Sequence, residues 1–150
     1  EIFTDLTPLA EKSGITLELA GDGVMTGSDA LIYRMIFNLT ENAIKYNRPD
    51  GSVQVCITQE PEKLLILVSD TGRGIPEEYQ QSIFQPFFRV DKSRSRTFGG
   101  AGLGLALVWE IAALHGGSVR VAESSDSGTT IAAELPRSGN HAAAPKNETL

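Results

Sequence analysis

The sequence predicts an α+β fold, a two-layer sandwich in which a mixed sheet of about five strands is covered on one face by about three helices. Three observations predict this class. Several segments carry apolar residues at helical spacing, several shorter segments alternate or are apolar throughout, and turn residues separate them. Because helical and strand segments are mixed along the chain, the helices can cover one face of a single sheet.

The first half of the chain contains two predicted helices. In order, we expect a helix over 2–13, a strand over 15–19, a short strand at 24–25 and a long helix from about 29 to 46. Ser28 or Asp29 is suited to cap the long helix. Its apolar stripe, which should face the sheet, comprises Ile32, Met35, Ile36, Leu39 and Ala43.

The second half contains most of the predicted strands. We expect strands over 53–58 and 63–69, a short helix beginning at Pro76, a helix over about 103–115, and strands over 118–123 and 129–135. The strand over 63–69 is apolar for most of its length, so both of its faces should be covered. Phe84 and Phe87 are expected in the core. Residues 1–136 thus form one domain, and 137–150 are expected to be a disordered tail.

Composition limits the classes of function. The formal net charge is −6, which argues against nucleic acid as a partner and requires local donors or a metal to hold any phosphate. The single cysteine, Cys56, excludes an internal disulfide and is expected to be a buried, inert thiol. The longest apolar run is too short to span a bilayer. The chain does not begin with Met, and we expect it to be part of a longer protein.

The long helix carries the first group of candidate ligands. Asn38, Asn42 and Lys45 lie at helical spacing on one face, turned away from the middle of the apolar stripe, and Glu41 adjoins them. Two amide oxygens one turn apart can bind a hard cation such as Mg²⁺. A lysine nearby can bind phosphate. A solvated helix face is the alternative.

The second group follows the apolar strand, in the sequence Asp70-Thr-Gly-Arg-Gly-Ile-Pro76. A carboxylate at a strand end can accept a hydrogen bond from an exocyclic amine, and the glycines allow close approach of a ligand. A simple turn after the strand is the alternative.

A third group, Gly99-Gly-Ala-Gly-Leu-Gly-Leu105, opens a helix, where backbone N–H groups can bind an anion. Its spacing is not the dinucleotide fingerprint, and the chain contains no P-loop motif.

The order and spacing of these motifs resemble the ATP-binding catalytic domain of sensor histidine kinases, of the GHKL superfamily with the Bergerat fold. The resemblance runs from about Glu1 to Pro136. It rests on the local sequences NLTENAIKYN, SDTGRGIP, FQPFFRVDKSRS, GGAGLGLAL, HGGSVRV and GTT. It implies ATP and Mg²⁺ as ligands, and a flexible ATP lid over residues 89–101.

The resemblance also implies roles for individual residues. At the phosphate end, Asn42 is the implied Mg²⁺ ligand, Asn38 a second or water-mediated ligand, and Lys45 the phosphate contact. The implied adenine contacts are Tyr46, Asp70, Gly72, Gly74, Ile75 and either Thr129 or Thr130. The implied phosphate loop and helix start comprise Gly100, Gly102, Leu103, Gly104 and Leu105.

Four residues are candidates for a catalytic role. Arg89 and Arg94 are suited to stabilise the transferring phosphoryl group, because its loose transition state depends on positioning and charge. In related ATPases a water-activating Glu precedes the Mg²⁺-binding Asn by one turn, and Asn38 occupies that place here, which fits a kinase. Glu41 either polarises a reacting group or is merely exposed.

The resemblance implies phosphoryl transfer to a histidine on a separate helical dimerisation domain, with a response regulator downstream. His115 is expected only to mark a helix end, so the fragment should bind ATP without carrying the phosphoacceptor. Kinases of this family dimerise through the separate helical segment, so we expect the fragment to be a monomer and the intact kinase a homodimer. Such kinases are mostly anchored in bacterial membranes, with this domain in the cytoplasm. Alternatives are an ATP-binding regulatory module without transfer activity, or an ATPase or anti-sigma serine kinase of the same superfamily.

Overall fold

The computed structural model describes residues 2–21, 29–86 and 104–136. Within them lie three α-helices, α1 (Ile2–Ser13), α2 (Asp29–Lys45) and α4 (Gly104–Leu114). Five strands accompany them: β1 (Thr16–Gly21), β2 (Ser52–Gln59), β3 (Lys63–Asp70), β4 (Ser118–Ser125) and β5 (Gly128–Pro136). Two 3₁₀ turns follow β3, η1 (Glu77–Tyr79) and η2 (Ser82–Phe84). None of the helices described is long and apolar enough to cross a bilayer.

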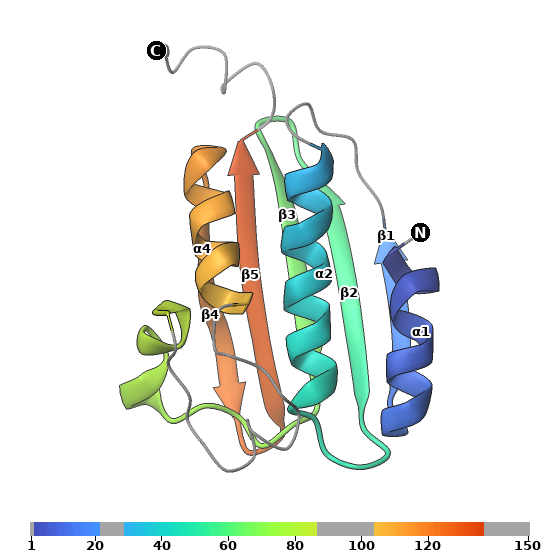
Figure 1. Cartoon of the computed structure of the whole chain (residues 1–150). Helices are drawn as coiled ribbons and strands as arrows, with labels where there is room; N and C mark the ends of the chain where they lie inside the picture. Colours follow the sequence, from blue (N-terminus) through green and yellow to red (C-terminus); the bar gives the residue numbers. More distant parts are fainter. Residues whose placement is uncertain (1, 22–28, 87–103, 137–150) are drawn as a thin grey trace.

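The strands form one mixed sheet in the order β1-β2-β3-β5-β4. β1 pairs with β2 in parallel, which requires a crossover, and α2 supplies it. All other neighbouring pairs are antiparallel. The three helices lie side by side on one face of the sheet (Figure 1), which confirms the predicted two-layer α+β class.

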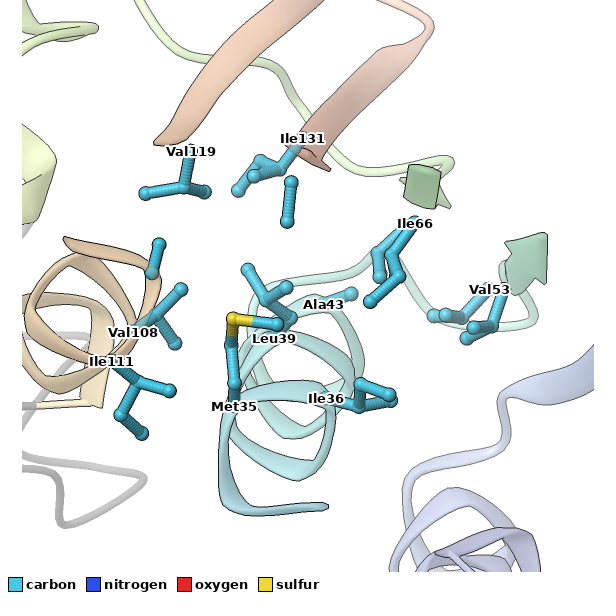
Figure 2. Packing of buried hydrophobic residues seen from close by; sticks show 14 of the residues in the cluster. Met35, Ile36, Leu39, Ala43, Val53, Ile66, Val108, Ile111, Val119 and Ile131 are labelled. Atoms are coloured by element: carbon cyan, nitrogen blue, oxygen red, sulfur yellow. The ribbon is translucent and has the colours of Figure 1, made fainter. Parts of the chain in front are cut away.

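The core lies between α2 and the sheet. Met35 and Leu39 of α2 are fully buried and face strand residues such as Ile66 and Ile131, while Val108 and Ile111 of α4 close the core from the side (Figure 2). The predicted stripe of α2 is therefore its buried face. Thr40 is also fully buried, and its hydroxyl donates to the Ile36 carbonyl at 2.8 Å.

The ends of several helices and strands lie together at one end of the sheet, the lower end in Figure 1. The C-terminal end of α2, the end of β3 at Asp70 and the hairpin between β4 and β5 lie there. The N-terminal end of α4 lies there too, because α4 runs antiparallel to β4 after a short turn. The topology therefore gathers the predicted ligand groups from distant parts of the sequence.

Two expectations about burial were wrong. On β3, Leu64, Ile66 and Val68 are buried, whereas Leu65 and Leu67 are only half-buried, because the helices cover one face of the strand and not both. Cys56 is half-buried rather than buried, since it alternates with the buried Val55 and so points to the helix-free face.

The helix-free face also carries charge. The Glu134 carboxylate on β5 accepts from Lys63 of β3 at 2.9 Å and from Arg120 of β4 at 2.7 Å. These two cations lower the pKa of the Glu134 carboxyl. A row of ion pairs thus runs across three strands of the face that the helices leave open.

Several predictions about where helices begin and end are confirmed. The turn at Pro76 begins η1, Phe84 is buried at the end of η2, and α4 ends before Gly116, whose φ is +75°. His115 marks that helix end: it is buried, and its Nδ1 lies 2.8 Å from the Ile111 carbonyl oxygen. The predicted strand at 24–25, Phe87 and the tail over 137–150 lie outside the described residues.

Candidate functional site

Asp70 is the last residue of β3, the central strand of the sheet. Its Oδ1 accepts hydrogen bonds from the backbone N–H groups of Gly72, at 2.8 Å, and of Thr129, at 3.2 Å. Burial raises the pKa of the Asp70 carboxyl, although these two N–H groups act in the opposite direction. Among the residues described, no hydrogen bond is formed by Oδ2. The carboxylate is thus fixed in orientation with one oxygen able to accept from a ligand.

The loop after Asp70 is packed tightly on its neighbours. A Cβ at Gly72 would lie 2.9 Å from the Tyr46 carbonyl oxygen. Gly74 has a φ of +85°, and a Cβ there would lie 2.1 Å from the Ser125 carbonyl oxygen. Both predicted glycines are therefore required where the loop passes between the end of α2 and the β4–β5 hairpin.

The far end of this loop is bound to the hairpin by hydroxyl groups. The backbone N–H of Ile75 donates to Ser124 Oγ at 2.7 Å, and Ser124 Oγ lies 2.8 Å from Thr129 Oγ1. The half-buried Ile75 side chain packs against the core. Ser124 was not among the predicted residues, because only the tertiary structure brings it to the loop.

The structure separates the two threonines that the sequence left as alternatives. Thr129 pairs with Asp70 in the ladder and is buried beside it. Thr130 points to the opposite face of the sheet, where its hydroxyl lies 2.8 Å from Ser69 Oγ. Thr129 is therefore the threonine that adjoins the carboxylate, and Thr130 is not brought to this side.

The polar face of α2 is half-buried. Asn38, Asn42, Glu41 and Lys45 all have intermediate exposure, as does Tyr46 just beyond the helix. Lys45 Nζ lies 3.9 Å from Glu41 Oε2. Glu41 therefore has an electrostatic partner one turn away, and this ion pair is its contact in the structure.

The end of α2 carries one buried polar residue that the sequence did not single out. Asn47 is 5% exposed, and its side chain bonds to Ser52 at the start of β2 and to Thr71, directly after Asp70. A polar residue directly after the predicted ligand helix was visible in the sequence, but nothing there indicated its burial.

The first turn of α4 has backbone N–H groups that lack a partner within the helix. Gly104 is its first residue and is exposed, and a Cβ there would meet no atom of the described part of the chain within 4 Å. Leu105 is half-buried and packs against the core, as expected of a residue that anchors the helix. The predicted lid over 89–101, with Arg89, Arg94 and Gly100, lies outside the described residues, as do Gly102 and Leu103 of the predicted phosphate loop and helix start.

The donor set suits a cation that keeps ligands from elsewhere. The described residues contain no group of three or more His, Cys, Asp or Glu side chains placed to hold a metal. The amide oxygens of Asn38 and Asn42 are hard donors, which fits Mg²⁺ when phosphate oxygens and water complete its coordination.

Comparison with known proteins identifies the family. Residues 27–139 match the family described as histidine kinase-, DNA gyrase B-, and HSP90-like ATPase. The chain belongs to this family. The family includes the group that the motif order resembled, so the resemblance is confirmed.

Individual relatives agree. The chain is 38% identical over 117 residues to the sensor histidine kinase RppB of Synechocystis sp. (strain ATCC 27184 / PCC 6803 / Kazusa). That match covers 78% of this chain but only 26% of RppB, so the chain spans about a quarter of the length of that relative.

Solved structures share the fold. The mycobacterial sensor histidine kinase MprB superposes with a TM-score of 0.76 and 30% identity, covering 91% of this chain and 93% of that one. Full-length ShkA in complex with AMPPNP superposes with a TM-score of 0.78 and 26% identity, covering 91% of this chain and 28% of that one.

Proposed function

We propose that this domain binds Mg-ATP and donates the γ-phosphoryl group to a histidine on a separate helical dimerisation domain of a two-component sensor kinase. The observation that carries the proposal is the fixed Asp70 carboxylate, whose Oδ1 is held by two backbone N–H groups. The structure of the similar protein ShkA contains AMPPNP, an ATP analogue, which supports a nucleotide as ligand.

Asp70 would bind the adenine end of the nucleotide. Its Oδ2 would accept a hydrogen bond from the 6-amino group, with Thr129 beside it and Gly72, Gly74 and Ile75 forming the adjacent loop. Guanine presents a carbonyl at the same place. An acceptor that faces an acceptor would leave both without a donor, at a cost of about 1–3 kcal/mol.

The polar face of α2 and the start of α4 would bind the phosphate end. Asn42 and Asn38 would hold Mg²⁺. The cation would neutralise charge on the phosphates, which this domain, with its net negative charge, cannot do alone. Lys45 would contact the phosphates. Glu41 would keep that ammonium group in place through their ion pair. Backbone N–H groups from Gly104 onward would bind phosphate oxygens at the helix start.

The transfer itself would break the bond between the γ-phosphorus and its bridging oxygen and form a bond from that phosphorus to a histidine nitrogen. ADP would leave with the bridging oxygen. Arg89 and Arg94 are proposed to stabilise charge on the transferring group. The chain's own residues thus position both ends of the nucleotide, and the acceptor comes from another domain.

Titration with ATP, with and without Mg²⁺, tests binding. Transfer is tested by incubating the domain with γ-labelled ATP and a separately produced histidine-bearing helical domain. The control is the same acceptor with its histidine replaced. Acid-labile label on the acceptor supports the proposal. Label on a protein serine would favour an anti-sigma kinase. Release of phosphate in the absence of an acceptor would favour an ATPase, and nucleotide binding without transfer or hydrolysis would favour a regulatory module.

The partners and location of the intact protein are part of the same proposal. By analogy with sensor kinases, the intact protein would be a membrane-anchored bacterial homodimer that passes its phosphoryl group to a response regulator. This domain would then act in the cytoplasm, and alone it would be a monomer.

A further inference from the structure

The end of α2 and the loop after β3 are joined by a cluster of hydrogen bonds between Asn47, Ser52 and Thr71. Thr71 Oγ1 donates to Asn47 Oδ1 at 2.9 Å and accepts from the Ser52 N–H at 2.9 Å. Asn47 Nδ2 donates to the Ser52 carbonyl at 2.8 Å, and the Thr71 N–H donates to the same carbonyl at 3.2 Å. We call the Asn47–Thr71 pair, bridged by Ser52, the α2–β3 clasp.

The clasp lies between the two halves of the proposed nucleotide site. Asn47 comes five residues after Asn42 and two after Lys45, at the end of the helix that carries the proposed metal and phosphate ligands. Thr71 directly follows Asp70, the proposed adenine ligand. The clasp is thus a direct bonded connection between the residues for the two ends of the ligand.

The other side of the Asp70 loop has its own bonds. The Thr129 N–H holds Asp70 Oδ1, and Ser124 Oγ holds the Ile75 N–H. These bonds come from the β4–β5 hairpin and do not involve α2. Loss of the clasp would therefore leave Asp70 oriented on the sheet while freeing the end of α2 to shift relative to it.

We propose that Asn47 and Thr71 are positioning residues, which set the separation between the adenine carboxylate and the metal-binding end of α2. This inference rests on the proposed function. A ligand that contacts both ends, such as Mg-ATP, depends on that separation. Adenosine lacks phosphates and so does not reach the metal or Lys45. Its contacts lie at the Asp70 end and at Tyr46, and its affinity should depend on that separation much less.

Gly51 shows how closely the clasp is packed. A Cβ there would lie 2.3 Å from Asn47 Oδ1 and 2.5 Å from Thr71 Oγ1. Its φ is not in the left-handed region, so a side chain at this position is excluded by the clasp and not by the backbone. Gly51→Ala would therefore separate Asn47 from Thr71 without removing any polar group of the clasp.

The test compares the affinity for Mg-ATP with the affinity for adenosine in matched variants. Thr71→Val removes the hydroxyl at nearly constant shape, and Thr71→Ser restores it. Ser69→Ala is the control, since it removes a hydroxyl–hydroxyl contact one residue before Asp70 on the opposite face. Calorimetry serves for Mg-ATP and NMR shift titration for adenosine, with thermal unfolding to verify that each variant is folded.

We expect Thr71→Val to weaken Mg-ATP binding at least fivefold and adenosine binding less than twofold. Thr71→Ser and Ser69→Ala should stay within twofold for both ligands. The inference is overturned if Thr71→Val retains wild-type affinity for Mg-ATP, if both ligands weaken equally, or if Thr71→Ser fails to restore binding.

Gly51→Ala provides a second test that keeps the hydroxyl. It should give the same selective loss of Mg-ATP affinity. If Thr71→Val does not fold, Gly51→Ala alone tests the inference. Equal weakening of both ligands in Gly51→Ala would overturn the inference. A wild-type domain that binds no Mg-ATP would refute the proposed function itself, which distinguishes that failure from failure of the clasp.

Discussion

Asp70 and Thr129 are joined twice: they are direct partners in the ladder between β3 and β5, and the Thr129 N–H donates to the Asp70 side chain at 3.2 Å. The orientation of the carboxylate is therefore determined by the pairing of two strands. Substitutions at Asp70 should therefore separate effects on ligand binding from effects on folding stability.

Asp70→Asn is predicted to weaken ATP binding at least tenfold without lowering the free energy of unfolding at neutral pH. Asn keeps an oxygen for the two N–H donors but replaces the acceptor Oδ2 by an NH₂ group, which cannot accept from the adenine amine. Titration calorimetry checks the first part, and denaturant unfolding checks the second. Unchanged ATP affinity would refute the role given to Asp70.

The pH dependence of that variant follows from the raised pKa of Asp70. A carboxyl with a higher pKa in the folded chain binds its proton more tightly there, so stability falls as the pH rises from the unfolded pKa to the folded pKa. Asn does not titrate. The stability of Asp70→Asn relative to wild type should therefore be greatest above the folded pKa and shrink towards acid pH. A difference that grows on acidification would contradict this sign.

Gly128→Ala is predicted to destabilise the fold by about 3 kcal/mol or more, because strain and a steric clash coincide. Gly128 has a φ of +140°, and a Cβ there would lie 1.9 Å from the Asp70 carbonyl oxygen. Gly104→Ala is the matched control, since its Cβ would meet none of the described residues within 4 Å. Chemical denaturation should show a large loss for the first substitution and none for the second.

Asn42→Ala is predicted to reduce the gain in ATP affinity that Mg²⁺ provides by roughly tenfold, the lower end of the cost of losing a residue that supports a metal site. Affinity measured in EDTA should change little, because the amide would act through the cation. Arg34→Ala, an exposed change on the same helix, is the control. Equal losses with and without Mg²⁺ would argue against a metal ligand.

Leu39→Ala is predicted to cost about 2–5 kcal/mol of unfolding free energy, because Leu39 is fully buried between α2 and the sheet. Leu114→Ala removes the same atoms from a side chain whose residue is 69% exposed, and it should change stability by less than about 0.5 kcal/mol. Similar losses for the two variants, measured by urea unfolding, would contradict the assignment of the core.

The order of elements was predictable because hydrophobic periodicity and turn residues reflect local structure. The faces of β3 were not. Its apolar run predicted cover on both faces, yet Leu65 and Leu67 lie on the helix-free side, the face on which Lys63, Glu134 and Arg120 form ion pairs. A run of apolar residues has no alternation from which to identify its exposed face.

The positions of the candidate residues in the fold were predictable where a motif lies in one segment: Asn42 lies on α2 and Asp70 ends β3, as expected. They were not predictable where distant segments meet. Ser124 and Thr71 are ordinary turn and strand residues in the sequence, and their bonds to Ile75 and Asn47 depend on how the hairpin and the end of α2 approach the loop. The resemblance left Thr129 and Thr130 as alternatives, since the strand register that decides which of them lies beside Asp70 was unknown.

The central position of β3 has a consequence for dynamics. β5 pairs with it along its whole length and β2 from Leu64 to Asp70, while the two edges of the sheet belong to β1 and β4. Its amide protons should therefore exchange with deuterated water only through global unfolding, later than those of the peripheral strands. The group proposed to recognise adenine thus stands on the segment that opens least often.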